Sequence, residues 1–124
     1  MQQQIQFVQT KKSDFLEDLV MEGLDTLGER FDWVIRADVF FKEEKGTYGK
    51  GKICEIRLSV PGPRIFASSN EESFEAAIAE TIQDLNRQLK KRKDEMYTSF
   101  GGKKGRPRIE EMEEGPGELE SEDE

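Results

Sequence analysis

The apolar residues of the chain follow two different periods, and these periods predict its secondary structure. In residues 13–30 and 70–96 they recur every three or four positions, as on the buried face of an amphipathic helix. In four other segments they alternate with polar residues, which is typical of strands that bury one face. These predicted strands cover residues 4–9, 33–43, 53–60 and 64–68.

Local signals predict where the two helices begin. Ser13 is expected to cap the first helix. Asn70 is expected to cap the second, with Glu71 and Glu72 near the positive end of the helix dipole. Gly23 lies on the apolar side of the first helix. It either permits the close approach of another element or is a tolerated weak position that costs about 1 kcal/mol relative to alanine.

The element order, strand–helix–three strands–helix, predicts an α+β fold. Short connections join the three consecutive strands, and Pro61-Gly62 suits a type II turn, so these strands should form an antiparallel meander. Both helices must bury an apolar stripe, and one face of the sheet can cover both. We therefore expect a two-layer β-α-β-β-β-α sandwich, a four-stranded sheet with two helices on one face. The other face would carry Arg36, Phe40, Lys42, Arg57, Arg64 and Phe66.

The apolar periodicity stops after Met96, and this predicts three regions. Residues 1–96 would form the folded domain, residues 97–108 a basic glycine-rich linker, and residues 109–124 an acidic tail. Neither of the last two regions has enough apolar surface to fold alone, so both are expected to be disordered in isolation.

The total charge of −8 conceals an uneven distribution. Residues 1–86 carry a net charge of −6, residues 87–108 carry +7, and residues 109–124 carry −9. Five cations in seven residues exceed what the negative end of a helix dipole requires, so they predict a surface that binds phosphates. A solvated helix end is the simpler alternative. The cations are Arg87, Lys90, Lys91, Arg92 and Lys93.

The composition argues against catalysis and metal binding. The chain has no histidine, which removes the usual near-neutral general base and the commonest zinc ligand. Its single cysteine, Cys54, excludes a multi-cysteine metal site, and an inward position in a strand favours a core role over a nucleophilic one. We expect no enzyme activity, no cofactor and no small-molecule substrate.

The sequence gives no sign of a membrane segment or of export. No apolar run approaches the roughly 20 residues needed to span a bilayer. The first residues, Met-Gln-Gln-Gln-Ile, lack the charged and apolar regions of a signal peptide. A cytoplasmic location without a membrane partner is therefore expected.

Several short motifs occur in a characteristic order over residues 5–96. They are Ile5-Gln6-Phe7, Leu24 through Phe31-Asp32, Phe41-Lys42-Glu43-Glu44-Lys45, Ala77-Ile78 and Leu85-Asn86-Arg87-Gln88-Leu89-Lys90-Lys91. In this order and spacing the chain resembles the ribosome hibernation-promoting factor and ribosome-associated inhibitor family, also called the sigma-54 modulation protein family. The last motif is similar to the family's Leu-x-Arg-Gln-Leu-x-Lys signature.

The resemblance implies a domain similar to double-stranded-RNA-binding folds. It also implies that the protein binds the small ribosomal subunit and its rRNA, and blocks the channel for mRNA and tRNA in idle ribosomes of stressed or stationary-phase cells. Arg87 and Lys91 match basic helix positions of the family, and Lys42 and Lys45 match the basic end of its second strand. Charge adds further residues, so the expected rRNA-binding set is Arg87, Lys90, Lys91, Arg92, Lys93, Lys42, Lys45, Arg36 and Arg57.

The chain also departs from the family pattern. It has Ser73-Phe74-Glu75 where members have Asp-Met-Tyr, and Asp84 where a lysine is usual. The first helix is acidic instead of lysine-bearing, which puts contacts from that helix in doubt. The chain lacks the second domain by which long members pair ribosomes, and its acidic tail resembles that of the short inhibitor type, so we expect it to idle single ribosomes. We also expect a monomer.

Two other functions stay open at this point. Residues 104–108 resemble an AT-hook, so the chain could be a regulator that binds nucleic acid through this segment and the basic helix end. Alternatively, the acidic tail could make the chain a protein-interaction module. The tail could also compete with phosphate for the basic residues of the same chain, or serve only to keep the protein soluble.

Overall fold

A computed structural model describes residues 1–101 of the chain. Strands and helices follow in the order β1 (Gln2–Val8), α1 (Asp14–Arg30), β2 (Arg36–Thr47), β3 (Lys50–Ser59), β4 (Ile65–Glu71) and α2 (Phe74–Gly101). This is the predicted β-α-β-β-β-α order. The described part of the chain divides after Leu89 into two units, and α2 continues from the first into the second.

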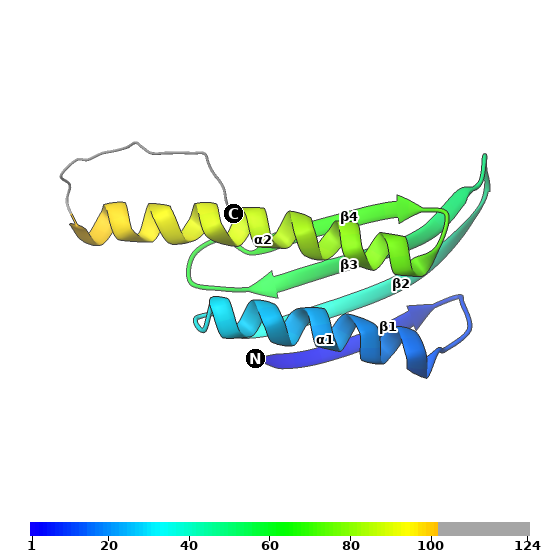
Figure 1. Ribbon diagram of the computed structural model, residues 1–124, viewed down its shortest axis with the longest axis horizontal. Helices are drawn as coiled ribbons and strands as arrows, with labels where there is room; N and C mark the ends of the chain where they lie inside the picture. Colours follow the sequence, from blue (N-terminus) through cyan, green and yellow to red (C-terminus); the bar gives the residue numbers. More distant parts are fainter. Residues whose placement is uncertain (102–124) are drawn as a thin grey trace. The chain divides into compact units, whose positions relative to one another are not determined.

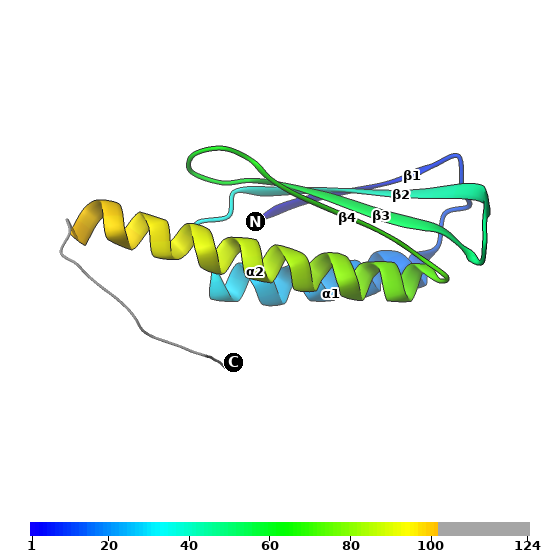
Figure 2. The same cartoon turned by 90° about the horizontal axis from the view of Figure 1, so that it is seen from above.

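The four strands form one mixed sheet in the spatial order β1-β2-β3-β4 (Figure 1). β2, β3 and β4 pair in antiparallel fashion, which confirms the predicted meander. β1 pairs with β2 in parallel, because α1 carries the chain back across the sheet before β2 begins. Within the first unit, α1 and the beginning of α2 lie on the same face of the sheet (Figure 2). The expected two-layer α+β architecture is confirmed.

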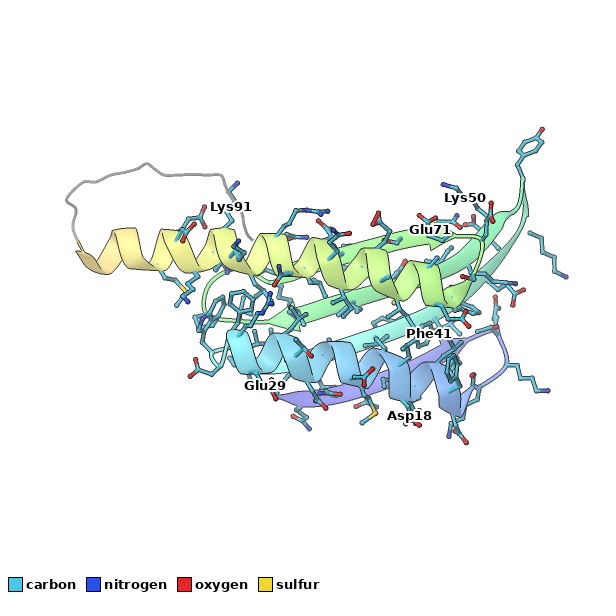
Figure 3. The ribbon with its side chains drawn as sticks, in the orientation of Figure 1. Asp18, Glu29, Phe41, Lys50, Glu71 and Lys91 are labelled. Carbon is cyan, nitrogen blue, oxygen red and sulfur yellow. The ribbon has the colours of Figure 1, made fainter. Side chains whose placement is uncertain are left out.

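The core fills the space between the sheet and the two helices. Phe41 of β2 is fully buried there, stacked on Phe7 with ring centroids 4.9 Å apart and in edge contact with Phe74 at 5.5 Å (Figure 3). The helices contribute the apolar stripes expected of them. The fully buried members of these stripes include Val20, Leu24, Ala77, Leu85 and Leu89.

Gly23 permits a close approach between the helices. A Cβ atom built at this position would lie 3.1 Å from Cγ1 of Ile82 on α2, tighter than ordinary van der Waals contact. The first of the two interpretations of this glycine is therefore confirmed.

The predicted cap of α1 is confirmed, and that of α2 is wrong. The Ser13 hydroxyl accepts a hydrogen bond from the Leu16 amide at 3.2 Å. The cap of α2 is Ser73, whose hydroxyl accepts from the Ala76 amide at 3.1 Å. Asn70 belongs to β4 instead, where its side-chain oxygen accepts from the Gly51 amide at 2.6 Å. Strand pairing of β4 with β3 as far as Glu71 outweighs the capping preference of Asn70.

The glycine-rich segment 46–51 is a tight hairpin and not the flexible loop that its composition predicts. β2 and β3 extend to Thr47 and Lys50, which leaves two residues in the turn. Both have positive φ, 48° at Tyr48 and 84° at Gly49, as a two-residue hairpin turn requires. Gly62 likewise has the positive φ, 89°, expected for its turn.

The end of α2 differs from the expected end at Met96. The helix continues to Gly101, so residues 97–101, expected to begin a linker, are helical. No proline or glycine interrupts the chain between Met96 and Gly101, and the residues there tolerate a helix. The AT-hook-like residues 104–108 and the acidic residues 109–124 lie outside the described residues, and the three-region division stays a prediction.

Candidate nucleic-acid interface

Arg87 of α2 is mostly exposed and lies beside a carboxylate of the same helix. Its side chain retains 62% of its accessible surface. Nη2 lies 3.4 Å from Oδ1 of Asp84, one turn earlier on α2. Asp84, which replaces the lysine expected from the family pattern, thus partly offsets the charge of Arg87.

The residues on either side of Arg87 hold this part of α2 in place. Asn86 accepts a hydrogen bond from Nη1 of Arg30 on α1 at 3.0 Å. Gln88 donates from Nε2 to the backbone oxygen of Phe66 on β4 at 2.9 Å. Leu85 and Leu89 are fully buried. The signature motif therefore anchors the helix through four residues and leaves Arg87 exposed to solvent.

The remaining helix cations belong to the second unit. Lys90 and Lys91 are exposed, whereas Arg92 and Lys93 are half-buried. Nε of Arg92 lies 3.8 Å from a carboxylate oxygen of Glu95, three residues later. Figure 3 shows Lys91 pointing away from α2. All four residues lie in the helix, as predicted.

Two of the predicted sheet cations are already paired with carboxylates. Arg36 binds Asp38 through Nη2 at 2.9 Å, and this hydrogen bond and charge raise the pKa of the guanidinium. Nζ of Lys42 lies 3.0 Å from Oε1 of Glu55 on the neighbouring strand. These pairs reduce the charge that either residue can offer to a phosphate, so Arg36 and Lys42 are weaker candidates than their charges alone suggest.

Arg57 and Lys45 differ from these paired residues. The Arg57 guanidinium lies over the ring of Phe40, 5.2 Å from its centroid. Lys45 is exposed near the end of β2. The carboxylate of Glu43 close by is held by Lys52 and Thr10, whose hydrogen bonds lower its pKa. Lys45 therefore remains a candidate phosphate ligand at the hairpin end of the sheet.

In the first unit the predicted residues are divided between the two layers. Arg87 lies on α2, whereas Arg36, Lys42 and Arg57 lie on strands, at positions that alternate with the buried ones. The sequence did not indicate that Asn86 and Gln88 would anchor the helix, although both flank the predicted arginine.

The first helix presents an acidic surface to solvent. Asp18 and Glu29 point outward from α1 in Figure 3. Glu22 and Asp25 are also exposed. Such a surface repels phosphates, so α1 is not a candidate for contact with RNA.

Cys54 occupies a core position and is a poor nucleophile. Its side chain is fully buried on the inner face of β3. Burial raises the pKa of the thiol to about 12, even though contact with the hydroxyl of Thr81 acts in the opposite direction. The thiol is therefore protonated at neutral pH, and the interpretation of Cys54 as a core residue is supported.

The buried thiol should make stability fall with increasing pH. An unfolded thiol ionises near pH 9.0, whereas the folded one keeps its proton to about pH 12. The folded state thus binds more protons between these values, and this stabilisation is lost as pH rises. At pH 10 the loss should be on the order of 1 kcal/mol relative to pH 7. Urea unfolding of wild type and Cys54→Ala at both pH values measures it, and equal pH dependence in the two proteins would contradict the assignment.

Neither a membrane-spanning helix nor a metal-binding cluster is present in the described part of the chain. No helix within residues 1–101 is long and apolar enough to cross a membrane. Within the same residues, no three Cys, Asp or Glu side chains come together as a candidate metal site.

Solved structures show where this fold occurs. A ribosomal subunit interface protein from Coxiella burnetii superposes with a TM-score of 0.64 and 21% identity, covering 76% of this chain and 99% of that one. The N-terminal domain of Thermus thermophilus Protein Y gives a TM-score of 0.62 and 22% identity, covering 73% and 98%. At these identities the structures show a shared fold.

Sequence comparison extends the similarity from fold to family. Residues 3–97 match the family model described as sigma 54 modulation protein / S30EA ribosomal protein. A ribosome hibernation promoting factor from Pseudomonas putida is 32% identical over 87 residues, which cover 70% of this chain and 81% of the relative. The match includes β1 from Gln3, the other three strands, α1, and α2 as far as Tyr97. The chain therefore belongs to the sigma 54 modulation protein / S30EA ribosomal protein family, which includes relatives named ribosome hibernation promoting factor.

Proposed function

We propose that this protein is a ribosome hibernation factor that binds the small ribosomal subunit and blocks its channel for mRNA and tRNA. Membership of the family and the name of the Pseudomonas putida relative support ribosome hibernation. The main structural support for binding to RNA is the exposure of Arg87 on a helix segment that Asn86 and Gln88 anchor. A cation on a fixed helix can bind a phosphate without first ordering its backbone.

The mechanism that these residues support is occlusion without catalysis. Arg87 on α2, together with Lys90 and Lys91, would neutralise phosphates of rRNA. Phosphate contacts fix the position of a protein on RNA and need no base sequence. A domain held in this way excludes other ligands by its volume, so the proposal requires no cofactor and no reaction. The acidic α1 would face away from RNA.

Salt dependence of binding tests the proposal. Co-sedimentation with purified small ribosomal subunits should weaken steeply between 50 and 200 mM salt, because each neutralised phosphate contributes a slope of about −0.7 to −0.9 in log affinity against log salt. Wild-type protein that fails to co-sediment at low salt, or that binds large and small subunits equally, would contradict the proposed function.

Asp84 is expected to weaken binding of this protein to the subunit. Asp84→Asn removes the carboxylate beside Arg87 and should raise the affinity about two- to fivefold, as expected for an exposed ion pair. Asp18→Asn on α1 is the matched control, since it makes the same change of charge at an exposed position of the other helix. Equal gains for the two variants in co-sedimentation would show a general effect of net charge and no local role of Asp84.

A further inference from the structure

The sheet face opposite the helices carries two aromatic side chains. Phe66 of β4 is 48% exposed, and Phe40 of β2 is half-buried. Between them on β3 lies Arg57, which is the cross-strand partner of Phe66. Phe40, Arg57 and Phe66 thus span three adjacent strands, and we call them the aromatic platform. Within the first unit no helix covers this face (Figure 2).

Arg57 keeps its charge available on the platform. Its guanidinium lies 5.2 Å from the centroid of the Phe40 ring, a cation–π arrangement. Asp38 lies across from it on β2 and is engaged by Arg36, and Glu55 on its own strand is engaged by Lys42. In residues 1–101, Arg57 forms no ion pair. An arginine held over a ring in this way offers its planar guanidinium and its positive charge at the same place.

The surroundings of the platform suit one class of ligand. Gln4 and Gln6 on β1 point to the same side, as the alternation of exposed and half-buried positions along this strand shows. Ser68 on β4 is the cross-strand partner of Glu55 and therefore shares its face. Amides and hydroxyls donate and accept hydrogen bonds, as the edges of a nucleotide base do. The neutralised ion pairs beside them do not form the array of free cations that phosphates of a duplex require.

We propose that the aromatic platform stacks an unpaired RNA base when the protein is bound to RNA. Exposed aromatic rings and arginine planes on an open sheet are a general means of binding single-stranded RNA, because every base has a flat face. This inference rests on the proposed function and assigns a second RNA-binding surface to it. Arg87 on α2 would bind phosphates, and Phe66 with Arg57 would bind a splayed base.

Phe66→Ala tests the inference, with Phe15→Ala as the matched control. Phe15 is 62% exposed on α1, so both variants lose an exposed ring and both should stay folded by circular dichroism. Fluorescence anisotropy would measure binding of a labelled single-stranded oligoribonucleotide and of a duplex of the same sequence. Phe66→Ala should lose about tenfold in affinity for the single strand and nothing for the duplex. Phe66→Trp should restore single-strand binding, and Phe15→Ala should bind like wild type.

Three outcomes would overturn the inference. Phe66→Ala could bind the single strand as tightly as Phe15→Ala. It could lose the same factor in affinity for the single strand and for the duplex, which would indicate an effect on RNA binding in general and not on base stacking. It could lose binding to small subunits but keep single-strand binding, which indicates contact with a ribosomal protein. The proposed function is tested separately, because wild-type protein that binds the oligoribonucleotide and not the subunit would contradict that function alone.

Discussion

Replacing Arg87 and Lys91 together by glutamate is expected to lower the affinity for small ribosomal subunits by about 100-fold at low salt, because two phosphate contacts are lost and two repulsive charges are added. The double variant removes two cations of α2 and adds two anions. If each cation neutralises one phosphate, the slope of log affinity against log salt should also fall by about 2 units. Arg87 is mostly exposed and pairs with Asp84 on the same helix, so its replacement should leave the core unchanged.

The control for this prediction changes the same charges elsewhere. Lys11 and Lys12 are exposed between β1 and α1, and their replacement by glutamate alters the net charge by the same amount. That control should lose much less affinity. Equal losses of affinity in the two double variants would mean that net charge alone governs binding. Unchanged binding of the Arg87 and Lys91 variant would show that these residues of α2 do not contact phosphates.

Phe41→Ala is expected to destabilise the fold by about 3–5 kcal/mol. Phe41 is fully buried, and its ring contacts those of Phe7 on β1 and Phe74 on α2. Its removal would leave a cavity at the point where the sheet meets the second helix. A domain of this kind has a total stability of about 5–15 kcal/mol, so a large part of it would be lost.

Urea unfolding measures this effect directly, and Phe15→Ala is again the control. Phe15 is exposed, and its loss should change the free energy of unfolding by less than about 0.5 kcal/mol. The Phe41 variant should also bind ribosomes less well at temperatures where it begins to unfold. If both variants unfolded at the same urea concentration, Phe41 would not have the central packing role described above.

Local sequence patterns predicted most of the fold because its elements follow them closely. The stripes through Leu24 and Leu85 and the alternation through Val39 and Ile56 became the buried faces of helices and strands. Boundaries were less predictable where pairing between distant residues decided them. Asn70 has the chemistry of a helix cap, but its place opposite Ile53 in the sheet put it in β4.

The candidate site was predictable only in part, for the same reason. The exposure of Arg87 follows from the stripe formed by Leu85 and Leu89. The pairing of Lys42 with Glu55 and the position of Arg57 over the Phe40 ring depend on the register between β2 and β3, which the sequence does not specify by itself. The sequence therefore shows the charges of these residues but does not predict which side chains they contact.

We propose above that this protein occupies the channel for mRNA and tRNA on the small subunit. Competition between the protein and tRNA, measured by filter binding of labelled tRNA to mRNA-programmed small subunits, tests it most directly. Saturating wild-type protein should displace the tRNA, and the Arg87 and Lys91 double variant should not do so at the same concentration. Simultaneous binding of wild-type protein and tRNA to the same subunits would contradict the claim.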